Sequence, residues 1–276
     1  MAGRNAFAAG VGTFPVDIWD AWYGKYSAGQ AVPPTALGNN LTLGMQITTF
    51  DDYWGQGEFI LCQFQTASTA LVTGTLVKWD QNYIVSAVPA TANLGYPVGF
   101  LSSNFPSDST LGVLTAPWNQ IQTTNQLYGW VQIAGLAPAL NNGTAATGKA
   151  FISATAGQIT STAAAGQEVL STEIVIATGG TWSRYGNTTF VGNTINGRSE
   201  LFLTEKNALF FGLTLAGTGI PSNTTISDMQ TGRNNSVLMS AAATASGAVT
   251  VTPAYTGGAN YCIVRCERPS MQGQIT

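Results

Sequence analysis

Asp51, Asp52 and Glu58 flank Trp54, and this cluster is the part of the sequence best suited to chemistry. A pair of carboxylates can serve as acid and base in glycoside hydrolysis, and a tryptophan beside acids can indicate a sugar site. The same three acids could ligate calcium, but the spacing of an EF-hand loop is missing. The other interpretation is a turn with solvated acids, and we favour it.

Other catalytic arrangements are missing from the sequence. The chain contains no histidine, which excludes a His-based triad, a His metal ligand and a His pH switch near neutrality. It has no P-loop, no GxSxG elbow, and no GxGxxG between a strand and a helix. We therefore expect a protein that is not an enzyme and that uses no cofactor or metal.

The three cysteines, Cys62, Cys262 and Cys266, are interpreted as small buried hydrophobic residues. Their odd number argues against a disulfide framework. In a strand, Cys262 and Cys266 would lie on one face about 13 Å apart, which is too far for a disulfide bond.

The composition favours strands over helices. Only 8% of the residues are charged, against about 25% in ordinary globular domains. Polar surfaces must then be made by Thr, Ser, Asn and Gln, which suit strands and turns. The net charge is −3 and the ten basic residues are scattered, which argues against direct nucleic-acid binding. The sequence also predicts no secretory signal and no membrane span, so we expect a soluble protein made in the cytoplasm.

The elements that would position these side chains are mostly short strands bounded by Gly, Pro and polar turns. A length of 276 residues indicates about two domains. Residues 1–40 are predicted to form an N-terminal arm with a short helix and a linker, and residues 41–178 a β domain. Residues 179–200 are a linker or irregular strands, and residues 201–276 form a second, smaller β domain. Strands of this length and spacing fit a small barrel or sandwich.

The N-terminal arm carries the candidate interface. Residues 1–13 are small and Gly-rich, and aromatic residues at helical spacing predict a helix over residues 15–26, which Pro15 would open. This aromatic face either packs on its own domain or anchors another subunit. The interface residues that we predict are Phe7, Phe14, Ile18, Trp19, Trp22 and Tyr23.

Four motifs between residues 40 and 177 resemble the head decoration, or capsid cement, proteins of tailed bacteriophages. They are WGQGEFILCQFQTASTALVTGTLVKWD, LGYPVGFLSS, YGWVQIAGLAPA and GKAFISATAGQITSTAAAGQEVLSTEI, in that order. A later stretch is similar to β segments of phage tail, fibre and capsid-associated proteins, and it reads TLAGTGIPSNTTISDMQTGRNNSVLMSAAATASGAVTVTP.

The resemblance implies a small β-barrel or β-tulip-like domain that sits on the capsid as a homotrimer. The implied partner is the major capsid protein, with which an N-terminal arm would pair, and the implied location is the capsid surface of the virion. The extra C-terminal domain departs from that pattern. We expect a virion protein that binds the outer surface of the capsid and stabilises the expanded shell. The alternative is a tail or fibre component in which residues 181–276 contact a host-surface glycan.

Overall fold

The computed structural model describes residues 6–7, 15–16, 22–24, 43–51, 54–64, 71–90, 96–102, 126–163, 168–177, 189–204, 209–210, 212–228, 236–254, 256–257 and 259–272. Regular secondary structure in these ranges consists of strands, and none of it is helical. The prediction of a mainly β protein is therefore confirmed. This part of the chain also holds no helix long and apolar enough to cross a bilayer.

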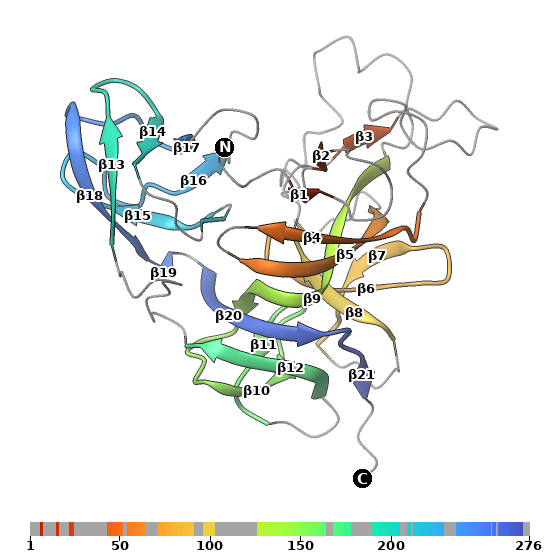
Figure 1. The fold of residues 1–276 in the computed structure, drawn as a ribbon. Helices are drawn as coiled ribbons and strands as arrows, with labels where there is room; N and C mark the ends of the chain where they lie inside the picture. The colour runs from red at the N-terminus through yellow and green to blue at the C-terminus, as the bar shows by residue number, and fades with distance from the viewer. Residues whose placement is uncertain are drawn as a thin grey trace.

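One long strand, β9 (Gln126–Asn141), is shared by two closed rings of strands (Figure 1). The first ring joins its first half to β5 (Gly55–Phe64), β7 (Ile84–Ala87), β6 (Leu76–Trp79) and β8 (Val98–Leu101). The second ring joins its second half to β20 (Ala259–Glu267), β12 (Glu168–Ile176), β10 (Gly148–Ile152) and β11 (Ile159–Thr160). The predicted barrel-like domain is therefore built as two rings on one strand.

The strand β9 changes direction where it passes from the first ring to the second. Its register with β5 shifts at Ile133, which is an extra residue relative to that partner. Gly135 then takes a φ of +97°, a conformation that side chains with a Cβ rarely adopt. The side-chain amide of Gln132 spans the bend by donating to the carbonyl oxygens of Ala134, at 3.1 Å, and Leu136, at 2.8 Å. These contacts fix the bend in place.

Alternating side chains fill both rings. In the first ring, Ile60 and Cys62 of β5 meet Val131 and Ile133 of β9 in one buried cluster. The second ring is filled largely by small residues of β9 and β20, including Ala137, Ala139, Cys262, Val264 and Cys266. Small residues suit a narrow barrel, whose interior is only wide enough for side chains. The residues between these, such as Phe59 and Leu61, point outward into a third cluster.

A second unit, residues 189–254, is inserted between β12 and β20. Its sheet runs in the order β15 (Thr214–Ala216), β18 (Gly247–Ala254), β13 (Phe190–Thr194), β14 (Glu200–Leu203), β17 (Ser236–Met239) and β16 (Ile226–Asp228). A bridge between Thr214 and Thr225 brings the two ends of this sheet together, so the inserted unit is a nearly closed barrel. The expected second, smaller β unit is thus present.

Two predicted domain boundaries differ from the structure. The strand β13 lies within residues 179–200, which we expected to be a linker or irregular strands, and it pairs in regular register with β14 and β18. The strand β20 lies within the predicted C-terminal domain, yet it hydrogen-bonds to β9 and β12 of the second ring. The chain therefore returns to the first domain after the inserted unit. Two short strands, β19 (Thr256–Gly257) and β21 (Met271–Gln272), flank β20.

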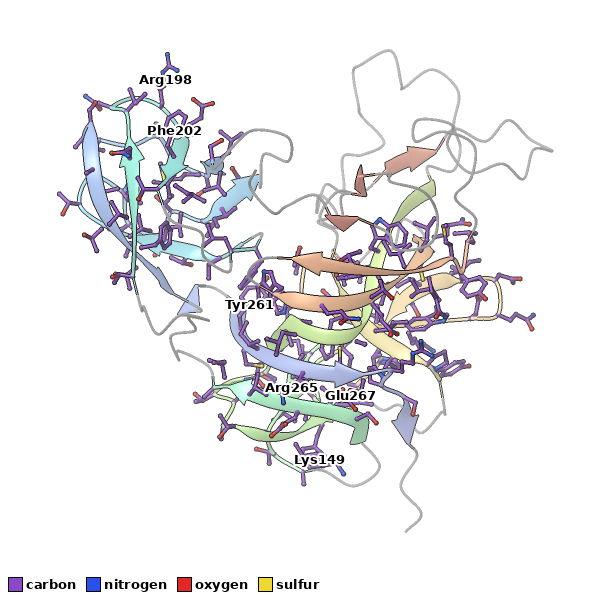
Figure 2. The ribbon with its side chains drawn as sticks, in the orientation of Figure 1. Lys149, Arg198, Phe202, Tyr261, Arg265 and Glu267 are labelled. Carbon is purple, nitrogen blue, oxygen red and sulfur yellow. The ribbon has the colours of Figure 1, made fainter. Side chains whose placement is uncertain are left out.

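The inserted unit contacts the rings through three aromatic side chains. The ring centre of Phe210 lies 6.1 Å from that of Trp54 and 4.9 Å from that of Tyr261, with interplanar angles of 63° and 65°. Edge-to-face pairs of this kind each add about 0.5–1.5 kcal/mol beyond the area that they bury. Tyr261 lies at the end of β20 nearest to the inserted unit (Figure 2), and its hydroxyl donates to the carbonyl oxygen of Thr73 at 3.1 Å.

Candidate functional site

Three of the six predicted interface residues fall in described strands. These are Phe7 in β1 (Ala6–Phe7), and Trp22 and Tyr23 in β3 (Trp22–Gly24); Phe14, Ile18 and Trp19 lie outside the described residues. The predicted helix is wrong at Pro15–Val16, which forms β2, and at Trp22–Gly24. Aromatic residues also have a high strand propensity, and the start of β9 offers β3 a partner.

The strand β3 joins the large sheet by main-chain pairing. Trp22 pairs with Tyr128 and Gly24 with Gln126, in antiparallel register at the first residues of β9. On the other edge of β9, Tyr128 pairs with Gln63 of β5. The N-terminal segment therefore extends the first ring as an added strand, an interaction that uses backbone groups and needs no special side chain.

A second edge lies at β4 (Gln46–Asp51). This strand pairs antiparallel with β5: Gln46 lies opposite Ile60 at one end, and Asp51 lies opposite Gly55 at the other. In the described sheet, β4 is the terminal strand on that side. The strand β1, which pairs with β2, lies near β4 (Figure 1). An edge strand presents unpaired backbone N–H and C=O groups to which another strand can add. The N-terminal strands and this edge together form the candidate interface.

Of the three acids around Trp54, Glu58 alone has a described side chain, whereas Asp52 and the side chain of Asp51 lie outside the described part of the structure. Trp54 is 8% exposed and packs against Phe210 of the inserted unit. Glu58 is bound by Arg268, with its Oε2 accepting from Nε at 3.0 Å and lying 2.9 Å from Nη2. Among the described residues, no group of three or more His, Cys, Asp or Glu side chains is placed to hold a metal ion.

The cysteines are buried and unbridged, as their sequence context predicted. Cys262 and Cys266 lie in the same cluster inside the second ring. Burial raises the pKa of both thiols from 9.0 to about 12, and it raises the pKa of Cys62 as well. Because only thiolates react readily, these side chains serve packing in the folded protein.

A hollow that we did not anticipate from the sequence lies where the turn between β6 and β7 meets the start of β8. Its volume is about 570 Å³. Aromatic side chains from two separate segments form half of its lining, with polar groups between them. The lining residues are Trp79, Asp80, Gln81, Tyr83, Tyr96 and Pro97.

Comparisons with protein-family models, with curated proteins and with solved structures find no match for this chain.

Proposed function

We propose that this chain is a structural protein of a tailed-bacteriophage virion that binds the outer surface of the capsid and stabilises the expanded shell. The observation that carries the proposal is the pairing of β3 with β9, because it shows the N-terminal segment joining a sheet through its backbone. A decoration protein that holds the shell through an N-terminal arm would use the same kind of contact. The partner is the major capsid protein, and the protein acts as a homotrimer.

The two rings give such an arm a firm base. Since β9 belongs to both rings, a force on the N-terminal segment at Gln126–Tyr128 is carried along one strand into both cores. Three linked arms raise the effective concentration of each contact, so modest individual contacts give firm attachment. A protein that binds only the expanded shell stabilises that state by mass action.

The composition agrees with dense packing on a shell. With 8% charged residues and a net charge of −3, neighbouring copies repel one another weakly. Neutral Thr, Ser and Asn side chains then provide the polar surface.

The test combines oligomeric state with shell binding. Sedimentation of the purified protein should give a trimer, and the protein should co-sediment with expanded empty shells but not with unexpanded ones. Deletion of residues 1–14 should weaken co-sedimentation while leaving the circular dichroism spectrum unchanged. A sharper variant is Ala6→Pro, which removes one backbone donor from β1. A matched control is Phe202→Ala, which removes an exposed aromatic side chain from the inserted unit.

Unchanged shell binding after the deletion would refute the role of the arm. Density for this chain on the tail of the virion, with none on the shell, would refute the proposal as a whole.

A further inference from the structure

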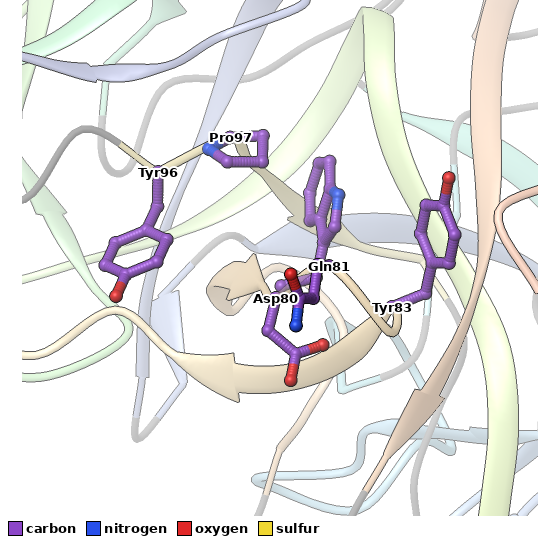
Figure 3. Close-up of a pocket in the computed structure, with 6 residues that line it drawn as sticks. Asp80, Gln81, Tyr83, Tyr96 and Pro97 are labelled. Atoms are coloured by element: carbon purple, nitrogen blue, oxygen red, sulfur yellow. The ribbon is translucent and has the colours of Figure 1, made fainter.

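The hollow at the β6–β7 turn has an elongated arrangement of side chains. Figure 3 shows Tyr83 and Tyr96 on opposite sides of Asp80 and Gln81, so the two tyrosines mark the ends of the hollow. Its volume of about 570 Å³ falls within the usual range for small-molecule sites, about 300–1,000 Å³. Asp80 and Gln81 are exposed, so the hollow opens to solvent.

The aromatic walls of the hollow are held by the cores beneath them. Trp79 and Tyr83 pack against the buried cluster of the first ring, and Tyr96 packs against that of the second. Tyr83 also lies against Gly44, where an added Cβ would overlap its ring. Because these rings are fixed before a ligand arrives, binding costs little side-chain entropy.

The carboxylate of Asp80 is fixed as well. The Oδ1 of Asp80 accepts hydrogen bonds from the backbone N–H groups of Asn82, at 2.8 Å, and Ile84, at 2.9 Å. These bonds hold the turn in which Tyr83 takes a φ of 59°. The amide of Gln81 lies between the tyrosines (Figure 3) and offers both a donor and an acceptor.

The charges of the hollow exclude two classes of ligand. No cation is among the lining residues, and the Asp80 carboxylate disfavours phosphates and acidic sugars. The nearby Lys78 places its Nζ 4.1 Å from the ring centre of Tyr96, so a cation already covers that ring. A quaternary ammonium ligand would need aromatic rings gathered around one point, whereas Tyr83 and Tyr96 stand apart.

We propose that this hollow binds a neutral saccharide. The pyranose ring has C–H faces that stack on flat aromatic side chains, here Trp79 and Tyr83, and hydroxyl groups that pair with an amide and a carboxylate, here Gln81 and Asp80. Since the hollow is open, its occupant is a segment of a glycan chain. The site lies on the first ring and none of its lining residues belongs to the inserted unit, although Pro97 of the lining forms a bridge to Ser270, within the residues 181–276 for which the sequence predicted a glycan contact as the alternative. It does not depend on shell binding.

The experiment uses the full-length protein and a panel of immobilised neutral oligosaccharides of glucose, galactose, mannose and N-acetylglucosamine, with sialylated and sulfated oligosaccharides alongside. The neutral oligosaccharide that binds best is then titrated in solution by NMR. We expect Trp79→Ala to weaken its affinity about tenfold or more, because aromatic anchors dominate such sites. Gln81→Ala should weaken it several-fold, and this exposed residue can be replaced without disturbing either core.

Phe202→Ala is the matched control, since Figure 2 places this exposed aromatic residue on the inserted unit. It should bind the oligosaccharide as the unchanged protein does. Binding of no neutral oligosaccharide, or of charged ones alone, overturns the proposal, and so does a loss confined to Phe202→Ala. If Trp79→Ala fails to fold, unchanged binding by Gln81→Ala overturns it. Shell co-sedimentation of the same variants is scored separately, so the two proposals fail independently.

Discussion

Gly135 is the residue on which the passage of β9 between the two rings depends most directly. A Cβ at this position would overlap the carbonyl oxygen of Gln56 and lie 3.0 Å from the Cα of Gly57, and both are backbone atoms of β5. Its φ of +97° adds strain for any side chain. We expect Gly135→Ala to lower the free energy of unfolding by more than about 2 kcal/mol, measured by urea denaturation.

Gly143→Ala is the control for this substitution. Gly143 has a φ of +78°, but nothing lies within 4 Å of an added Cβ. The change should therefore cost only about 1 kcal/mol, from backbone strain. Equal losses for the two variants would mean that the close approach of β5 to the bend is unimportant.

The buried thiols predict a loss of stability at alkaline pH. The pKa of Cys262 and Cys266 is about 12 in the folded protein, against an ordinary value of 9.0. Below pH 9 both states keep these protons, so the contribution to stability is complete. Between pH 9 and pH 12 the unfolded chain loses them while the folded chain keeps them, so stability falls as the pH rises.

The slope should approach about 1.4 kcal/mol per pH unit for each thiol. It can be measured from urea midpoints at several pH values above 9. The double variant Cys262→Ala/Cys266→Ala should show a shallower decline, whatever its stability at neutral pH. An identical slope would assign alkaline unfolding to other groups.

At the scale of elements, the β6–β7 turn makes a separate prediction. Asp80→Ala removes the acceptor of the two backbone hydrogen bonds from Asn82 and Ile84. We expect a loss of about 1 kcal/mol in the free energy of unfolding, because the turn is exposed. Asp80→Asn keeps a side-chain oxygen for an Asx turn and should lose much less. Equal stability of both variants and the unchanged protein would show that the carboxylate does not hold the turn.

Short apolar strands were predictable because their signals are local. In residues 54–64, apolar side chains either alternate with polar ones or follow one another directly. This stretch forms β5, which lies between β4 and β9. The strand β9 continues through Pro138, although proline has no N–H to donate within a sheet. Leu140 donates its N–H away from β20 to Gly74 at 2.8 Å, and the Pro138 nitrogen faces the same side. The proline therefore removes no bond to β20.

Long-range pairings had no local signal. The partners β12 and β20 are separated by residues 177–258, and no periodicity shows that the chain returns across the inserted unit. The hollow was missed for the same reason. Trp79, Asp80 and Tyr83 belong to one visible hairpin, but Tyr96 and Pro97 reach them only because Lys78 pairs with Val98. The aromatic spacing of the N-terminal arm fitted a helix, yet an available partner strand decided the conformation of β3.

At the scale of the whole molecule, Phe210 couples the inserted unit to the rings. Its side chain is fully buried between Trp54 and Tyr261. Replacing a buried phenylalanine by alanine usually costs about 3–5 kcal/mol. We expect Phe210→Ala to split thermal unfolding into two calorimetric transitions, because each unit keeps its own strands but loses their main aromatic contact.

Phe202→Ala makes the same chemical change at a position that is 36% exposed. It should leave the calorimetric profile of the protein unchanged. If Phe210→Ala shifts the profile to lower temperature without changing its shape, the two units are coupled by other contacts.

The place of β20 in the fold has a consequence for the order in which the protein is made. The ribosome completes β12 and then the whole inserted unit before it adds β20, which closes the second ring. At about 5–20 residues per second, residues 177–258 take roughly 4–16 s to synthesise. During that interval β9 and β12 lack their neighbour, and unpaired strand edges favour aggregation. Nascent chains stalled before residue 259 should therefore recruit chaperones, and chains stalled with β20 outside the exit tunnel should release them.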